Sequence, residues 1–484
     1  MIAKLKKHPV LLTLVAWFSV MWSWSFFTDS LELANSKSQG LILAFVVVAI
    51  NVAVSTVIVW YSLKYIAKIH VRFGTKKFLL LGLPLFALTD FLVCWGTTII
   101  WLGPQGNVDN ILPMGSLSLL LIRTPLAFAA RFVGFYGLAA IAWLTLYLAF
   151  QPAIHEELGV KAQKAKHKAL ISSRRYVLVP LFLAVIGATV GWYVYKTPDG
   201  VPIKATLISE TLTRRVRAID PKDIDLVVFP EYGLEKITND NLKERVGRTK
   251  GEQHPVYFLG SEQIFTDGTS GHRNNMMFGN TTDGILERQD KYRLIPGGED
   301  LPYVLRVIFR LTGQRSTLDY FTYAKSVIKG EQQLQPFVIN DKIRVAAAVC
   351  SSIIAPQDYH AFARSGATIF TNSASLSTFK GSRLFAWQQK SMARFMAIAN
   401  SRYFLQSANA ASAYALDNNG NQLAETRDVS STQLVAVTNS KKTVYTHVGE
   451  WLVYLGILIA VGYLIVYRRK NLQKSLSRFA TIKR

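Results

Sequence analysis

The stretch LILAFVVVAINVAVSTVIVWY, residues 41–61, decides the architecture of this 484-residue chain. It carries no charged residue, and about 20 consecutive apolar residues are enough for one helix to cross the hydrocarbon core of a bilayer. Five other segments have a comparable length and apolar character: 11–27, 78–101, 132–150, 176–195 and 451–467. The sequence therefore predicts a polytopic α-helical membrane bundle, with about five spans in an N-terminal region, 1–195, and one C-terminal span, 451–467.

The composition agrees with a chain that lies largely in lipid. Half of the residues (50%) are hydrophobic and only 18% are charged, which is more apolar than ordinary soluble domains. The net charge of +24 comes from Lys and Arg in short runs between apolar segments, where such residues set membrane topology and do not indicate nucleic-acid binding. The two cysteines, Cys94 and Cys350, lie inside an apolar span and at the end of a strand-like run, so a disulfide framework is not expected.

The distribution of basic residues also predicts the orientation of the spans, because short loops rich in Lys and Arg stay in the cytoplasm. With a basic, cytoplasmic N-terminus and a retained first span, all of the basic stretches fall on that side: 62–77, 151–175 and the tail 468–484. The remaining connections fall on the extracytoplasmic side: 28–40, 102–131 and the long segment 196–450.

The apolar segment 113–130 differs from the predicted spans because Arg123 and Pro125 interrupt it. We expect it to be a half-helix or an interfacial segment. Arg123 and Arg131 would then lie at the outer membrane surface, where a guanidinium binds a phospholipid phosphate or simply extends toward the headgroup layer. The sequence leaves both alternatives open.

A single carboxylate, Asp90, lies in the middle of the predicted span 78–101. An ionisable residue inside a membrane raises the hypothesis of a functional group. The alternative is a structural hydrogen bond to another span, with Asn51 of the second segment as the candidate partner.

Segment 196–450 has ordinary polar composition and is long enough to bury a core of its own. Short β-rich runs recur along it, at 205–208, 225–229, 256–260, 343–349, 368–371, 403–407 and 433–437. Helical or amphipathic stretches lie between several of these runs, at 210–219, 239–251 and 387–400. This alternation predicts a layered α/β domain between the last two spans.

Three polar residues of this domain each follow an apolar or strand-like run: Glu231, Lys291 and Cys350. The ends of strands are where α/β sheets place their reactive groups. Each residue alone also has an ordinary explanation, namely a surface turn for Glu231, a solvated pair with Asp290 for Lys291, and a small core residue for Cys350.

The sequence motifs around these residues resemble those of the carbon-nitrogen hydrolase (nitrilase) superfamily and, within it, the apolipoprotein N-acyltransferase family. The matching stretches are VVFPE at 227–231, KYRLIPGGEDLP at 291–302 and AVC at 348–350, with FTNSA at 370–374 and ARFMAIA at 393–399 further along. The resemblance covers nearly the whole chain. It implies an extracytoplasmic domain at 196–450 with the nitrilase-like αββα sandwich.

The resemblance also implies a role for each residue of a Glu-Lys-Cys triad. Cys350 would be the nucleophile and Glu231 the base that takes its proton. Lys291, together with the backbone N–H of Ser351, would stabilise the oxyanion. Glu299 would support Lys291 and Glu231 from beside the site, and neither a metal nor an organic cofactor is implied.

The activity implied by the resemblance is transfer of a fatty acyl chain from a membrane phospholipid, through a Cys thioester, to the N-terminal amine of a lipoprotein's lipidated cysteine. The bacterial cytoplasmic membrane is the implied location. Ser351 and Ser352 stand where the family usually has an aromatic residue and a Glu. Two alternatives therefore stay open, a membrane-tethered amidase or transferase with a different amine acceptor, and a non-catalytic scaffold.

Overall fold

The computed structural model of the chain describes these residues: 9–27, 37–109, 111–160, 176–211, 214, 224–235, 245–246, 255–265, 272–320, 327–377 and 382–482. Several sequence-based expectations fall wholly or mostly outside the described residues. They are the basic start of the chain, most of the outer loop 28–40, the basic part of the loop 151–175, and the helices expected at 210–219 and 239–251.

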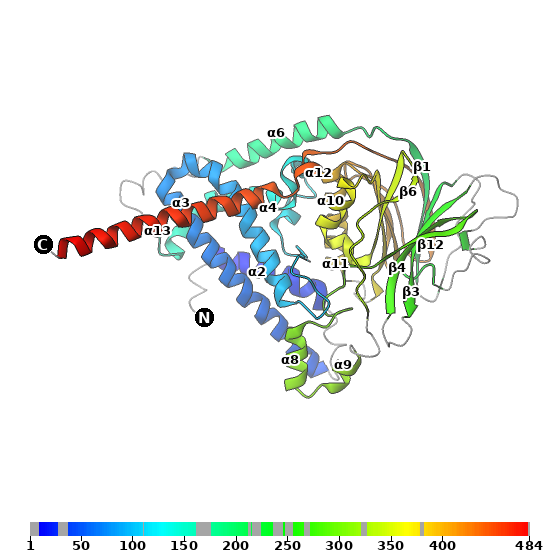
Figure 1. The fold of residues 1–484 in the computed structure, drawn as a ribbon, viewed down its shortest axis with the longest axis horizontal. Coiled ribbons are helices and arrows are strands. Elements are labelled where there is room, and N and C mark those ends of the chain that lie inside the picture. Colours follow the sequence, from blue (N-terminus) through cyan, green and yellow to red (C-terminus); the bar gives the residue numbers. More distant parts are fainter. Residues whose placement is uncertain are drawn as a thin grey trace.

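Five long helices form a bundle on one side of the molecule (Figure 1). They are α2 (Pro9–Phe27), α3 (Lys37–Ile100), α4 (Ala130–Glu157), α6 (Leu178–Tyr195) and α13 (Trp451–Ile482). By length and composition, the described residues contain 4 helices able to cross a membrane: Gly40–Ile100, Pro125–Glu157, Leu178–Tyr195 and Trp451–Arg469. A shorter apolar helix, Pro9–Trp22, lies within α2. The expected membrane region is thus present, while the number of crossings stays a prediction.

The 64-residue helix α3 breaks at Gly74, which has a φ of 74° and a ψ of 163°. Only glycine adopts a positive φ of this kind without strain. The break falls inside the basic stretch 62–77, between the two predicted spans 41–61 and 78–101. Helix α3 therefore consists of two apolar parts that meet at Gly74, and these correspond to the two predicted spans.

The segment between α3 and α4 contains no continuous helix among its described residues. It forms two short 3-10 helices, η1 (Leu117–Leu120) and η2 (Pro125–Ala129), in place of one half-helix, and the alternative of an interfacial segment stays a prediction. The segment also donates hydrogen bonds to Asp90 of α3. The Asp90 carboxylate accepts from Ser116 Oγ (2.5 Å) and from the backbone N–H of Leu117 (3.1 Å). A third donor is Trp143 Nε1 of α4, at 2.9 Å.

The expected hydrogen bond between Asp90 and Asn51 is not formed, so this expectation is wrong. The Asn51 Oδ1 atom accepts instead from Trp101 Nε1, at 2.8 Å. The sequence placed both polar residues in neighbouring spans but could not show that the 3-10 turn η1 folds back onto α3 and supplies the donors for Asp90.

Twelve strands among the described residues form one sheet of the second region. They are β1 (Pro202–Glu210), β2 (Leu226–Val228), β3 (Tyr257–Phe265), β4 (His272–Asn280), β5 (Gly284–Asp290), β6 (Phe337–Asn340), β7 (Ile343–Val349), β8 (Ile369–Ser375), β9 (Phe404–Asn409), β10 (Ala413–Leu416), β11 (Gln422–Thr426) and β12 (Ser430–Val437). The order is β5-β4-β3-β2-β1-β9-β8-β7-β6, with β12 beside β1, and β10 joining β9 to β11. All seven predicted strands lie within or overlap observed ones, whereas β4, β5, β6, β10 and β11 were not predicted.

The sheet folds over itself, because β4 packs against β7 and β3 against β8 although they lie far apart in the strand order. Three helices, α10 (Pro356–Arg364), α11 (Arg383–Asn400) and α12 (Val444–Val448), lie between these strands and the bundle (Figure 1). Helix α11 contacts both α2 and α4. The short helices α8 (Tyr303–Leu311) and α9 (Arg315–Asp319) lie apart from this layer. A nitrilase-like α/β domain is therefore packed on the apolar helices.

Arg131 joins the two regions. Its side chain is 0% exposed and donates hydrogen bonds to the backbone carbonyls of Ile398 (3.0 Å), Gly191 (2.7 Å) and Asn418 (2.7 Å). A guanidinium enclosed in this way presents no face to a lipid headgroup. The expectation of a headgroup contact at Arg131 is therefore wrong.

Glu450 makes a second joint, just before α13. Helix α4 is interrupted at Gly134, where φ is 74°, and the next two N–H groups, of Phe135 and Tyr136, donate to the Glu450 carboxylate at 2.9 and 3.0 Å. A carboxylate at the N-terminus of a helix satisfies N–H groups that have no partner within the helix. The end of the α/β domain is thereby fixed to α4.

Candidate active site

The strand directions bring Glu231, Lys291 and Cys350 to the same edge of the sheet. Strands β2, β1, β9, β8 and β7 are mutually parallel, and β5 has the direction of β2 because two antiparallel pairings, through β4 and β3, separate them. Each of the three residues follows the end of one of these strands, β2, β5 or β7. Their side chains therefore converge although 60 residues separate Glu231 from Lys291.

Lys291 lies between two carboxylates. Its Nζ atom donates to Glu231 Oε1 at 3.1 Å and to Glu299 Oε1 at 2.6 Å. The other oxygen of Glu299 accepts from the backbone N–H of Ile295, at 3.0 Å. Glu231 and Lys291 are 2% and 3% exposed, so the ion pairs are shielded from water and their charges interact strongly.

Cys350 directly follows β7 and begins the 3-10 helix η6 (Cys350–Ile354). Its φ of 45° is positive, as is the φ of 64° at Tyr232, directly after Glu231. Positive φ is uncommon for residues other than glycine and persists only where the surroundings enforce it. The Sγ atom lies 3.5 Å from the backbone carbonyl oxygen of Ser375, at the end of β8. The sulfur is thus held at the sheet edge by a sharp turn.

The buried charges shift the proton affinities of the site. Burial raises the pKa of Glu231, against the opposing effects of Lys291 and of hydrogen bonds from Cys350 and Lys291. Burial also raises the pKa of Cys350 well above its ordinary value, and Glu231 raises it further, while Lys291 opposes both. Burial alone would lower the pKa of Lys291, but Glu231 and Glu299 outweigh it and raise that pKa.

These shifts favour an ammonium ion at Lys291 and a thiol at Cys350, because burial raises the pKa of Cys350 more than the attraction of Lys291 lowers it. The thiol therefore needs a neighbouring base before it reacts. Glu231, with a hydrogen bond to Cys350 and a raised proton affinity, is placed to be that base.

Two asparagines that the sequence did not single out orient Glu231. Asn274 Nδ2 of β4 donates to Glu231 Oε1 at 3.2 Å. Asn409 Nδ2, at the end of β9, donates to the backbone carbonyl of Glu231. Asn409 ends β9, just beyond the predicted strand 403–407, whereas Asn274 lies within β4, which was not predicted.

A buried ion pair supports the turn that carries Cys350. Arg293 Nε donates to Asp358 Oδ2 at 2.7 Å, and a second nitrogen donates to the other oxygen. The Ser351 hydroxyl donates to the backbone carbonyl of Arg293. Arg293, which follows Lys291 closely in the chain, is thereby bound to Ser351, whose backbone N–H is expected to help stabilise an oxyanion.

Arg123, the other expected headgroup contact, takes no part in the hydrogen bonds of the triad. Its Nε atom donates to Ser391 Oγ of α11 at 3.2 Å, and its guanidinium lies 5.5 Å from the ring centre of Trp387. It lines the wall of a cleft beside α11. Among the described residues there is no group of three or more His, Cys, Asp or Glu side chains suited to a metal ion.

A sheet that folds over itself, with a carboxylate, an ammonium and a thiol gathered at one edge, matches the class expected from the sequence. The family model described as carbon-nitrogen hydrolase matches residues 183–444. The chain belongs to the carbon-nitrogen hydrolase family, as the resemblance indicated.

Among known proteins, the chain is similar to one named apolipoprotein N-acyltransferase, from Pasteurella multocida. The two are 24% identical over 328 residues, which cover 65% of this chain and 59% of that relative. The match thus spans less than two thirds of the relative's length, and the identity is low. Family membership and this relative together support an enzyme.

Solved structures show more distant likenesses. Nit3 of Saccharomyces cerevisiae, a member of branch 10 of the nitrilase superfamily, is 14% identical with a TM-score of 0.34, covering 52% of this chain and 94% of that one. An amidase from Nesterenkonia sp. is 15% identical with a TM-score of 0.32, covering 51% and 94%. These values are too low to carry an inference about substrate or mechanism.

Proposed function

We propose that this protein is an N-acyltransferase that moves a fatty acyl chain from a membrane phospholipid to the N-terminal amine of a lipoprotein's lipidated cysteine. The observation that carries the proposal is the contact of Lys291 with both Glu231 and Glu299, beside the Cys350 thiol. The named relative from Pasteurella multocida supports the choice of acyltransferase within the family.

In the first half of the reaction, Glu231 takes the thiol proton as Cys350 Sγ attacks the ester carbonyl of the phospholipid. The ammonium of Lys291 and the backbone N–H of Ser351 stabilise the negative oxygen of the tetrahedral intermediate. The intermediate then collapses, the bond to the glycerol oxygen breaks, and Glu231 returns the proton to that oxygen. A lysophospholipid leaves, and the acyl chain remains as a thioester of Cys350.

In the second half, the neutral amine of the acceptor attacks the thioester carbonyl. Glu231 takes a proton from the nitrogen, the carbon–sulfur bond breaks, and the proton passes to Cys350. The products are an amide and the free thiol. One carboxylate with a raised pKa thus serves both halves, because the raised pKa makes it a stronger base for the thiol and the amine, and the same carboxyl group then returns the proton.

The arrangement of the two regions supports lipid substrates. The α/β domain follows α6 and precedes α13 along the chain, and Arg131 and Glu450 lock it to the apolar helices. In a membrane with both termini in the cytoplasm, the domain 196–450 would lie at the extracytoplasmic headgroup surface. In this proposal the membrane is the bacterial cytoplasmic membrane, and no cofactor takes part.

The deciding experiment incubates the purified full chain with a phospholipid that carries a labelled acyl chain, without any acceptor. Intact-protein mass spectrometry should show one acyl adduct, which peptide mapping assigns to Cys350 and which a lipopeptide amine then removes as the labelled amide. The Cys350→Ala variant should show neither the adduct nor the amide. Transfer at the wild-type rate by Cys350→Ala would end the thioester mechanism.

One observation keeps a second function in view. Ser351 and Ser352, two small hydroxyl residues, follow the nucleophile, which suits an amidase or a transferase with another acceptor. In an amidase the thioester formed in the first step would be released by water, so fatty acid would accumulate at the same rate with and without the lipopeptide. A persistent acyl-enzyme without acceptor excludes the amidase, and removal of the acyl chain by the lipopeptide amine excludes a transferase that needs another acceptor.

A further inference from the structure

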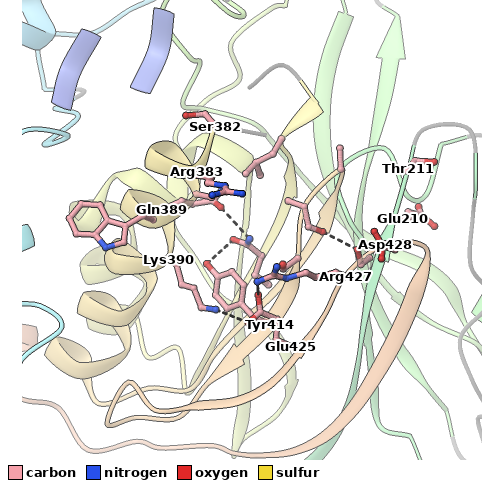
Figure 2. A pocket seen from close by; sticks show the side chains of 18 of the residues that line it. Glu210, Thr211, Ser382, Arg383, Gln389, Lys390, Tyr414, Glu425, Arg427 and Asp428 are labelled. Atoms are coloured by element: carbon pink, nitrogen blue, oxygen red, sulfur yellow. Dashed lines mark hydrogen bonds and ion pairs between the residues drawn. The ribbon is translucent and has the colours of Figure 1, made fainter. Parts of the chain in front are cut away.

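A cleft of about 710 Å³ lies beside α11, and none of the triad residues lines it. Figure 2 shows Arg383 and Gln389 of α11 on one wall and Glu210, Thr211 and Asp428 on the other. A cavity of this size is in the range of small-molecule sites. The mechanism above assigns no role to it.

The charges that line the cleft are unequally paired. Glu210 forms an ion pair with Arg245 at 2.8 Å, and Glu425 is held by Lys390 at 2.9 Å and by Arg427 at 3.3 Å. Glu210 and Arg245 neutralise each other, whereas the single charge of Glu425 faces two cations.

Two cations of the cleft remain outside these pairs. Among the described residues, neither Arg123 nor Arg383 has a carboxylate partner. Arg383 begins α11 directly after its N-cap, Ser382, so the N-terminus of the helix adds to the positive potential there. Trp387, one turn further along the helix, lies against Arg123 and also lines the cleft.

A third cation reinforces this wall. Arg394 of α11 lies close enough to Arg123 that, after burial, its charge is the main cause lowering the pKa of Arg123. The Arg394 Nε atom is buried without a hydrogen-bond partner among the described residues. Asp428 also lines the cleft, and the charge of Asp417 acts on Arg394. The cations of the lining, Arg123, Arg383, Lys390 and Arg427, outnumber its carboxylates, Glu210, Glu425 and Asp428. A lining with this excess of cations favours an anion with several acceptor oxygens.

The cleft shares a wall with the catalytic edge. Leu376 and Ala410 line it. Leu376 follows Ser375, whose carbonyl oxygen contacts Cys350 Sγ. Ala410 follows Asn409, which donates to Glu231. A ligand anchored by its anion in the cleft would therefore lie next to the nucleophile.

We infer that this cleft binds the phosphodiester of the phospholipid acyl donor through Arg123 and Arg383. In a phospholipid, only a few bonds of the glycerol unit separate this anion from the ester carbonyl. The inference rests on the proposed function for the identity of the lipid. The anion-binding chemistry of the cleft does not depend on acyl transfer.

The test measures equilibrium binding of a short-chain dialkyl phosphatidylglycerol to the full chain in an uncharged detergent. Its ether bonds leave no carbonyl for Cys350 to attack, so binding is separated from catalysis. A dialkylglycerol without phosphate is the matched uncharged probe. The variants are Arg123→Gln, Arg383→Gln and the double variant, and Arg310→Gln, an exposed arginine of α8, is the control.

Each single variant should weaken binding of the phosphatidylglycerol probe about tenfold, since a charge-assisted, forked contact is lost. The double variant should weaken it further, while binding of the uncharged probe and all binding by Arg310→Gln should match wild type. Arg123 and Arg383 are both exposed, so the variants should keep the wild-type unfolding midpoint.

Three outcomes would overturn the inference. The first is that the double variant binds the charged probe with wild-type affinity. The second is that the variants lose affinity for the charged and the uncharged probe equally. The third is that inorganic phosphate, at a concentration that saturates the cleft, displaces the charged lipid probe, which would assign the cleft to free phosphate. Failure of the proposed function has a different signature. In that case no acyl-enzyme forms, yet charged-probe binding still depends on the two arginines, also in Cys350→Ala.

Discussion

Asp90 in the helical bundle and Glu231 at the sheet edge are both buried carboxyl groups, with exposures of 0% and 2%. Their surroundings differ. Asp90 accepts hydrogen bonds from a hydroxyl, a backbone N–H and an indole N–H, and the Cys94 thiol lies 4.0 Å from it, so that all of its donors are neutral and, among the described residues, no ammonium or second carboxylate contacts it. Glu231 faces an ammonium, a second carboxylate beyond it, and a thiol.

The difference separates a structural carboxylate from a reactive one. Fixed neutral donors satisfy the oxygens of Asp90 and link α3, η1 and α4, so its role is to hold the helices together. The partners of Glu231 exchange protons with it, and their charges shift one another's pKa. Four experiments, ordered from the largest expected loss of rate to the smallest, test whether this contrast holds.

The largest losses are expected at the triad itself. Glu231→Gln keeps the shape but removes the base, and Lys291→Met keeps most of the volume but removes the oxyanion charge. We expect Glu231→Gln to lower the rate of acyl-enzyme formation by at least about 10³-fold and Lys291→Met by about 10²–10³-fold. Single-turnover acylation with labelled phospholipid measures both, and a rate within tenfold of wild type in either variant would remove that residue from the mechanism.

The pH dependence should show that Glu231 and Glu299 are coupled. The raised pKa of Glu231 means that the acylation rate falls on acidification at a pH above 4.5, the ordinary value for Glu. Because the charge of Glu299 raises that pKa, Glu299→Gln should move the acid limb to lower pH and preserve the rate in more acidic solution. Rate profiles of the two proteins between pH 4 and 8 provide the test. An acid limb that stays in place, or moves upward, contradicts the coupling.

A smaller effect is expected at Ser351, whose hydroxyl ties the turn after Cys350 to Arg293. Ser351→Ala keeps the backbone N–H but releases the turn, and loss of one buried hydrogen bond should slow acylation about fivefold with little change in KM. Ser352→Ala is the matched control, since it removes a neighbouring hydroxyl for which no hydrogen bond is seen among the described residues, and it should match wild type. Equal losses in both variants would place the effect in general packing of η6.

Asp90→Asn should leave the acylation rate per folded molecule unchanged, although its carboxylate is the more deeply buried. The amide offers one acceptor in place of two and leaves a donor unsatisfied, which should cost about 1–3 kcal/mol of stability. Unfolding in detergent and single-turnover acylation of the remaining folded protein measure the two quantities. A wild-type unfolding midpoint with a lost rate would make Asp90 a functional group and dissolve the contrast with Glu231.

Local patterns of the sequence carried much of this result. Uninterrupted apolar stretches predicted the long helices, since burial in lipid is a property of composition and length. Repeated β-rich runs predicted seven strands. Positions after strand ends, together with the resemblance to the family's motifs, identified Glu231, Lys291, Glu299 and Cys350 as candidate site residues. The strands that were missed, such as β4 and β5, are rich in polar residues and therefore lack the apolar, β-rich pattern that marked the predicted strands.

Only the tertiary structure decided which polar groups meet. Arg123 and Arg131 have similar surroundings in the sequence, but the structure separates them. Backbone carbonyls of α6, α11 and the turn after β10 enclose Arg131, whereas Arg123 lines an open cleft with Arg383. Ser116 and Trp143 as partners of Asp90, and Asp358 as partner of Arg293, are equally remote along the chain. Spacing in the sequence fixes which face of a helix or strand a residue occupies, but the partner on that face depends on how distant segments pack, because hydrogen bonds and ion pairs act only over a few ångströms.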